Sequence, residues 1–115
     1  MELTLEKRGE VAVVTPRVEH LDASNAEDFK RDMTPVLEAN RKILLNMSPL
    51  TFLDSAGLGA LLSCLRRLSS AGGDMKLSGV SKPVRSVFQI TRMHRIFDIF
   101  DTPEEALHAF QENAT

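Results

Sequence analysis

LDSAGLGALLSCLRRL, residues 53–68, is the stretch that decides the fold. Leucines recur along it at the spacing of one face of an α-helix, at positions 58, 61, 62, 65 and 68. A continuous apolar run at residues 43–45 precedes it, which is typical of a central strand covered on both faces. A polar turn, residues 54–57, stands between the two. The pattern predicts a buried strand, a compact turn and a helix that begins at Ser55.

Ser55 at the start of a helix has two interpretations. Its hydroxyl could accept a hydrogen bond from a free N–H group of the first turn and act as a cap. Gly57 and Gly59 favour an exposed functional hydroxyl instead, because each weakens a helix by roughly 1 kcal/mol relative to Ala and leaves no side chain to shield Ser55. A phosphate added there would meet the positive end of the helix dipole. The residues alone leave both interpretations open.

LDSAGLG, residues 53–59, followed by the leucine-faced helix, resembles the signature of the STAS domain, and most closely that of the bacterial anti-sigma factor antagonists. In that family the residue after the Asp is the serine that a partner kinase phosphorylates, so the resemblance implies that Ser55 is the acceptor. The family often has a second hydroxyl residue where this chain has Ala56. The similarity covers nearly all of the chain in length and element order.

Asp22 is the second residue that the resemblance singles out. In the antagonists an Asp that follows a Leu in this loop lies beside the phosphorylated serine, and here Leu21 precedes Asp22. The family commonly has Gly-Glu before that pair, whereas this chain has Glu19 and His20. An alternative is that Asp22 only helps to cap a helix beginning at Ser24, since Asp and Ser both favour such local hydrogen bonds.

The resemblance also implies partners. Unphosphorylated, the chain would bind a serine kinase of the histidine-kinase-like ATPase type that is also an anti-sigma factor, and so free a sigma factor for transcription. That kinase, with ATP and magnesium, would phosphorylate Ser55 and release the chain, and a separate serine phosphatase would reset it. The chain itself would need no cofactor or metal. The expected partner-binding residues are Asp22, Asp54, Ala56, Gly57, Leu58 and Gly59.

A different class of function remains open. The chain could be a STAS scaffold or regulatory subunit of another signalling or transport complex that involves no sigma factor. The sequence also leaves a homodimer open.

Composition favours one ordinary globular domain spanning residues 1–115. Of these residues 43% are hydrophobic and 26% charged, and the net charge of −2 gives no electrostatic case for nucleic-acid binding. No run approaches the roughly 18 apolar residues of a membrane span, and the N-terminus lacks an apolar signal core. The single cysteine, Cys64, excludes an internal disulfide and is expected to be a small buried residue. We therefore expect a cytoplasmic protein with no membrane partner.

An enzyme would need a constellation that the sequence does not show. Leu53 stands where the first glycine of a G-x-S-x-G nucleophile turn belongs, and His20, His94 and His108 have no sequence-level reason to approach Ser55. One cysteine and three separated histidines give no metal-ligand spacing, and the glycine turn lacks the Gly-Lys-Ser/Thr ending of a P-loop. We expect a substrate and binding module, not a catalyst.

The remaining elements indicate an α/β fold with a mixed sheet of about four to five strands and about four helices. Two strands at 2–7 and 10–16 should form a hairpin, and further strands are expected at 42–47, 75–80 and 96–100. A helix should begin at Ser24 in a capping box with Glu27, and Pro35 should kink it or end it early. A third helix should open at residues 81–83, and a closing helix at Thr102 and Pro103. Residues 112–115 have the composition of a tail.

Overall fold

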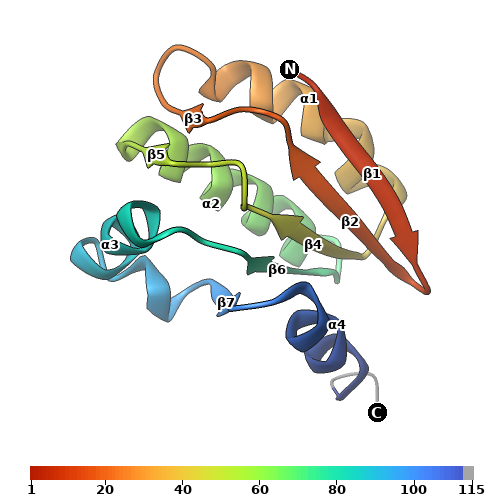
Figure 1. Cartoon of the computed structure of the whole chain (residues 1–115). Coiled ribbons are helices and arrows are strands. Elements are labelled where there is room, and N and C mark those ends of the chain that lie inside the picture. The colour runs from red at the N-terminus through yellow and green to blue at the C-terminus, as the bar shows by residue number, and fades with distance from the viewer. Residues whose placement is uncertain (113–115) are drawn as a thin grey trace.

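A five-stranded mixed sheet forms the centre of the computed structural model, which describes residues 1–112 (Figure 1). Strands β1 (Leu3–Arg8) and β2 (Val11–Pro16) make an antiparallel hairpin whose turn contains Gly9 at a positive φ of 63°. Strands β4 (Lys42–Asn46), β6 (Asp74–Ser78) and β7 (Asp98–Phe100) follow β2 in parallel, in the order β1-β2-β4-β6-β7. The predicted α/β class and mixed sheet are confirmed.

Four helices cover the sheet. Helices α1 (Ala26–Ala39) and α2 (Ser55–Ser70) pack against each other behind the sheet in Figure 1, and α4 (Pro103–Glu112) lies on the opposite face. Helix α3 (Lys82–Ile90) buries Val84 and Phe88 in the same core as α1 and α2. The leucine face of α2 is buried as its spacing predicts, except that Leu62 is half-buried.

A buried lysine lies between the sheet and α4. Lys76 of β6 is 1% exposed, and its ammonium group donates hydrogen bonds to Asp74 at 3.0 Å and Asp98 at 2.9 Å. The same nitrogen lies 4.9 Å from the centre of the Phe110 ring. Lys76 thus joins three elements, β6, β7 and α4, through polar and aromatic contacts.

The capping box predicted at Ser24 is wrong. Helix α1 begins at Ala26, and Ser24 lies in the preceding loop, where its backbone N–H and its hydroxyl both donate to Asp22 Oδ1, at 2.9 and 2.6 Å. Asn25 is the N-cap residue but makes no side-chain cap, because its amide accepts from Asp22 N and donates to His20 O. Asp22 therefore organises the loop before α1 and does not cap a helix at Ser24.

Of the two outcomes predicted at Pro35, the early end is wrong, since α1 continues to Ala39, and the kink stays a prediction. Pro35 lies on the exposed side of the helix, where the carbonyl that loses its partner can be hydrated.

Four predicted boundaries in the C-terminal half change. The last strand begins at Asp98, two residues later than expected. A 3-10 helix, η1 (Met93–Arg95), lies before it, and the ring of Phe97 packs edge-on against that of Phe88, with 5.4 Å between the ring centres. Strand β6 begins and ends earlier than predicted, at Asp74 and Ser78. Glu112 ends α4 and is not part of a tail; residues 113–115 lie outside the described residues.

A second, two-stranded sheet was not predicted. Strands β3 (His20–Leu21) and β5 (Phe52–Leu53) pair in parallel, with His20 opposite Phe52 and Leu21 opposite Leu53. The β5 end is held further by hydrogen bonds from the backbone N–H groups of Thr51 and Phe52 to Glu19 O, at 2.7 and 3.2 Å. This small sheet brings the loop after β3 beside the start of α2.

Candidate functional site

Asp54, not Ser55, caps helix α2. The Asp54 carboxylate accepts a hydrogen bond from Gly57 N at 2.9 Å, and its backbone carbonyl accepts the first helical bond from Leu58 N. Ser55 is the first residue of the helix and its side chain is exposed. The interpretation of Ser55 as the cap is therefore wrong, and its hydroxyl is available at the surface.

The two glycines of the turn have different roles. Gly57 is buried, and a β-carbon added there would lie 2.1 Å from Leu21 O and 2.8 Å from Leu53 Cδ1. The absence of a side chain at Gly57 therefore lets α2 approach β3 closely. The predicted role of this glycine is a different one, to leave Ser55 unshielded.

Gly59 does match the predicted reason. It is exposed, and a β-carbon there would meet no atom within 4 Å. Residues four apart share one face of a helix, and helical side chains lean towards the N-terminus, so a side chain at position 59 would lean over Ser55. Glycine at this position keeps the approach to the Ser55 hydroxyl open.

Asp54 also ties the turn to the loop that bears Asp22. Its second carboxylate oxygen accepts from Ala23 N at 3.2 Å, and Asp54 N donates to Leu21 O at 3.4 Å. The predicted neighbours Asp22 and Ser55 therefore lie on adjoining segments that one carboxylate holds together.

The remaining predicted partner-binding residues differ in exposure. Ala56 is half-buried and Leu58 is 7% exposed within the core. Leu58 and Gly57 thus support the turn from below, whereas Ser55 and Gly59 form its outer surface.

The turn carries negative charge that hydrogen bonds stabilise but no ion pair among residues 1–112 neutralises. The hydrogen bond from the Ser24 hydroxyl is the main reason that the pKa of Asp22 lies below its usual value of 3.8, so Asp22 is ionised at neutral pH. Within the described residues neither Asp22 nor Asp54 is in an ion pair. The two carboxylates are therefore left for a partner or a modification to meet.

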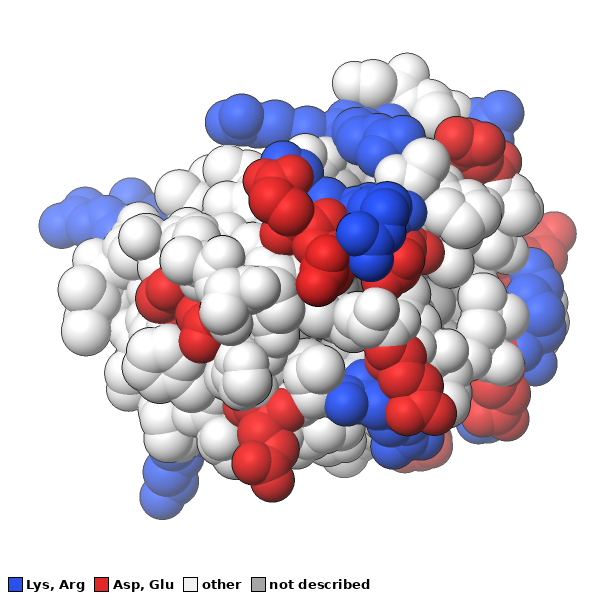
Figure 2. All heavy atoms as spheres, turned by 90° about the horizontal axis from the view of Figure 1, so that it is seen from above, with Lys and Arg blue, Asp and Glu red and all other residues white. Residues whose placement is uncertain are grey.

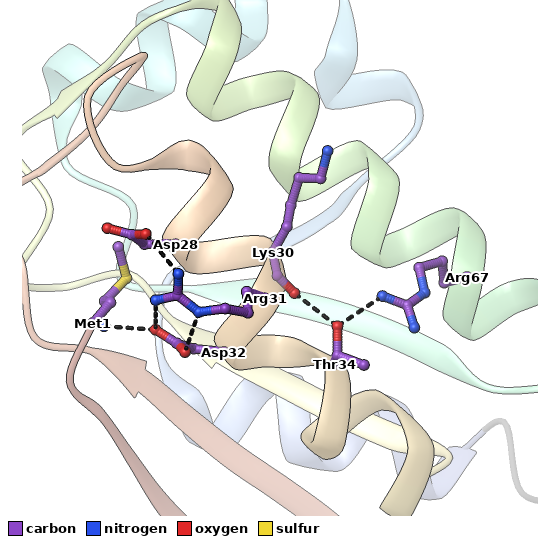
Figure 3. Close-up of polar contacts among 7 residues, drawn as sticks. All are labelled: Met1, Asp28, Lys30, Arg31, Asp32, Thr34 and Arg67. Carbon is purple, nitrogen blue, oxygen red and sulfur yellow. Dashed lines mark hydrogen bonds and ion pairs between the residues drawn. The ribbon is translucent and has the colours of Figure 1, made fainter.

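Charges elsewhere on this side are neutralised locally. On α1, Arg31 lies 3.0 Å from Asp28 and 3.3 Å from Asp32, and Asp32 also pairs with the amino group of Met1 (Figure 3). Figure 2, which looks down from the α1 side, shows acidic and basic side chains clustered together on this face, with separate acidic side chains beside the cluster. Several charges of α1 are thus paired with opposite charges, unlike those of the turn at Ser55.

Of the histidines considered for catalysis, the structure brings His20 near the turn, since His20 pairs with Phe52 in the small sheet. Cys64 is buried, and this burial raises the pKa of its thiol to about 11, as expected for a packing residue. His94 Nδ1 lies 3.3 Å from Phe88 O, away from the turn. Within residues 1–112, no three His, Cys, Asp or Glu side chains could together hold a metal ion.

Sequence reasoning missed Asn25 and Phe52. Asn25 holds the loop from both sides, which only the tertiary structure reveals. Phe52 is 53% exposed three residues before Ser55, a position that its place in an apolar run concealed.

Comparisons with known proteins identify the family and the fold. The family model of the STAS domain matches residues 2–106. A Thermotoga neapolitana protein provisionally named an anti-sigma factor antagonist is 35% identical over 104 residues, which cover 89% of this chain and 91% of that protein. Among the described residues, no helix has the length and apolar character needed to cross a membrane.

Solved structures agree with this result. The crystal structure of a provisionally named anti-sigma factor antagonist from Thermotoga maritima is similar with a TM-score of 0.86 and 30% identity, covering 93% of this chain and 92% of that one. The anti-sigma factor antagonist SpoIIAA in its unphosphorylated form gives a TM-score of 0.69 and 27% identity, over 96% of this chain and 98% of that one. The Bacillus cell fate determinant SpoIIAA in its phosphorylated form gives a TM-score of 0.70 and 27% identity, covering 95% of this chain and 99% of that one.

Proposed function

The chain belongs to the STAS domain family, and we propose that it acts as an anti-sigma factor antagonist whose binding is switched by phosphorylation of Ser55. The observation that carries this proposal is the exposed Ser55 hydroxyl, relieved of capping by Asp54 and left uncovered by Gly59. The similarity to SpoIIAA, a protein solved in phosphorylated and unphosphorylated forms, supports the assignment of a switch.

The switch follows from charge. Phosphorylation of Ser55 adds about −1.5 to −2 charges beside the carboxylates of Asp22 and Asp54. Backbone N–H groups of the first turn of α2 have no helical acceptor and lie at the positive end of the dipole, so they offset part of this charge and the domain stays folded. A partner packed against the turn would meet added bulk and unpaired charge, and its affinity would fall.

The partner in this proposal is a serine kinase of the histidine-kinase-like ATPase type that also acts as the anti-sigma factor. It would supply the nucleotide and the magnesium, and a separate serine phosphatase would restore the hydroxyl. This chain would supply the acceptor and the docking surface: Asp22, Asp54, Ser55, Ala56 and Gly59, with Gly57 and Leu58 beneath them. Its role would be regulatory and not catalytic, carried out in the cytoplasm.

The test is phosphorylation and binding with purified kinases of this type from the source organism. Incubation with ATP and magnesium should add one phosphate, located at Ser55 by mass spectrometry. Ser55→Ala should bind the kinase without release, and Ser55→Asp should bind weakly, while Ser69→Ala, which changes an exposed serine at the far end of the same helix, should behave as wild type.

Two results would contradict the proposal. Equal kinase affinity for wild type and Ser55→Asp would remove the switch. Binding to a signalling or transport assembly, with no effect on any sigma factor, would favour the STAS scaffold instead.

A further inference from the structure

Phe52 is presented at the surface by a rigid backbone. Side chains alternate along a strand, so β5 places Leu53 in the core, 3% exposed, and Phe52 outward, 53% exposed. The backbone beneath the ring is fixed by pairing with His20 and by the hydrogen bonds to Glu19 O. A partner binding this ring would not have to order the strand that carries it.

No other phenylalanine of the chain is exposed to this degree. All six lie in the described residues, and the others are buried or half-buried: Phe29, Phe88, Phe97, Phe100 and Phe110. A single exposed apolar side chain is ordinary on a protein surface, so exposure alone assigns Phe52 no role. Its distance from Ser55 is the deciding observation.

Phe52 lies within reach of an interface of ordinary size centred on Ser55. Phe52 precedes Ser55 by three positions, so their Cα atoms are at most about 11 Å apart. A stable interface buries about 800 Å² on each partner, which corresponds to a disc of roughly 16 Å radius. A contact area of that size centred on Ser55 extends beyond Phe52.

We propose that Phe52 is the apolar anchor of this contact, and that its ring enters an apolar recess of the kinase beside the kinase's phosphate-transfer site. This inference rests on the proposed function and adds a binding residue to it. Buried aromatic side chains near the centre of an interface are the residues that most often dominate its affinity. Because the ring contacts the kinase before and after phosphate transfer, it would contribute to binding and not to the chemical step.

The test compares three variants of the full chain with the purified kinase that phosphorylates wild-type Ser55. Phe52→Ala should raise KM for the chain about 10- to 30-fold and leave kcat within about twofold. Phe52→Leu, which keeps an apolar group, should recover much of the loss. Leu5→Ala is the matched control, because Leu5 is 48% exposed and lies in β1, an edge strand of the other sheet.

Binding without chemistry gives a second readout. Phe52→Ala combined with Ser55→Ala should bind the kinase about 10- to 30-fold more weakly than Ser55→Ala alone. Thermal denaturation of each variant separates this effect from loss of fold. An unchanged KM for Phe52→Ala, or a fall in kcat alone, would overturn the anchor while Ser55 phosphorylation stood. Failure of every kinase to phosphorylate the wild-type chain would overturn the proposed function and the anchor with it.

Discussion

Replacing Gly57 by alanine tests the close approach of α2 to β3. The added β-carbon would lie 2.1 Å from Leu21 O, and about 0.9 Å more is needed to reach 3.0 Å, below which real β-carbons are essentially not found. The atom in the way belongs to the backbone of β3, so a rotamer change cannot relieve the contact. The start of α2 must move away from β3.

Two opposing effects set how much the free energy of unfolding falls in Gly57→Ala. Overpacking a tight site costs about 1–3 kcal/mol, and here the upper end applies, because the shift also stretches the hydrogen bonds from Ala23 N and to Leu21 O. Alanine favours the helix over glycine by about 1 kcal/mol. The net loss in the free energy of unfolding is therefore about 2 kcal/mol, which for a domain of this size lowers Tm by about 8 °C.

Gly59→Ala is the control for this argument. It makes the same chemical change two residues further along the same helix, where no atom lies within 4 Å of the new carbon. Only the propensity effect remains, so Tm should rise by about 2–4 °C. The two variants should thus move Tm in opposite directions.

Thermal unfolding followed by circular dichroism measures both variants, and phosphorylation of Ser55 measures the consequence for the turn. Gly57→Ala should also be phosphorylated more slowly, because the shift separates Ser55 from the Asp22 loop. If Gly57→Ala melts at or above the wild-type temperature, the contact between α2 and β3 does not exist as described, and the reasoning fails.

Three further outcomes follow from other contacts. Asp54→Ala should cost about 1–2 kcal/mol in urea denaturation through loss of the cap, whereas Ser55→Ala should cost almost nothing, because Ser55 caps nothing. Cys64 should not react with a thiol reagent such as DTNB at pH 8 until the protein unfolds, since burial raises its pKa to about 11; rapid labelling of the native protein would contradict this. Burial lowers the pKa of Lys76, but hydrogen bonds to its two aspartates outweigh this effect and raise it above 10.5. The stabilisation from the charged Lys76 is therefore complete below pH 10.5 and is lost as the pH rises through the folded-state pKa. The fall in the free energy of unfolding at alkaline pH should accordingly be smaller in Lys76→Met than in the wild type.

The elements predicted correctly are those that regular spacing specifies. The leucines of α2 repeat along one helix face, and residues 43–45 read as a strand buried on both sides, which they are in β4. Thr102 caps α4 as predicted, accepting from Glu105 N at 3.2 Å. In each of these cases the local pattern and the tertiary structure favour the same conformation.

The failures occur where another group, near or distant in sequence, takes the partner that a local pattern assigns. Ser24 and Glu27 satisfy the pattern of a capping box, but the Ser24 hydroxyl donates to Asp22, two residues earlier, and the Asn25 amide bonds to the backbone of His20 and Asp22. Strands β3 and β5 have two residues each, too few for alternation to be visible, and the bond between Ala23 and Asp54 joins positions 31 apart in sequence. No local rule contains this information.

The structure divides two tasks between adjacent residues, and this division explains how Ser55 could be modified without unfolding the domain. If Ser55 were the cap, a phosphate on its oxygen would compete with the bond that starts α2. Asp54 makes that bond with one carboxylate oxygen and holds the loop after β3 with the other, so the framework of the turn does not depend on the Ser55 hydroxyl. Phosphorylation would therefore change the charge and shape of the surface while the cap, the loop and the core beneath them keep their contacts, as the proposed switch requires.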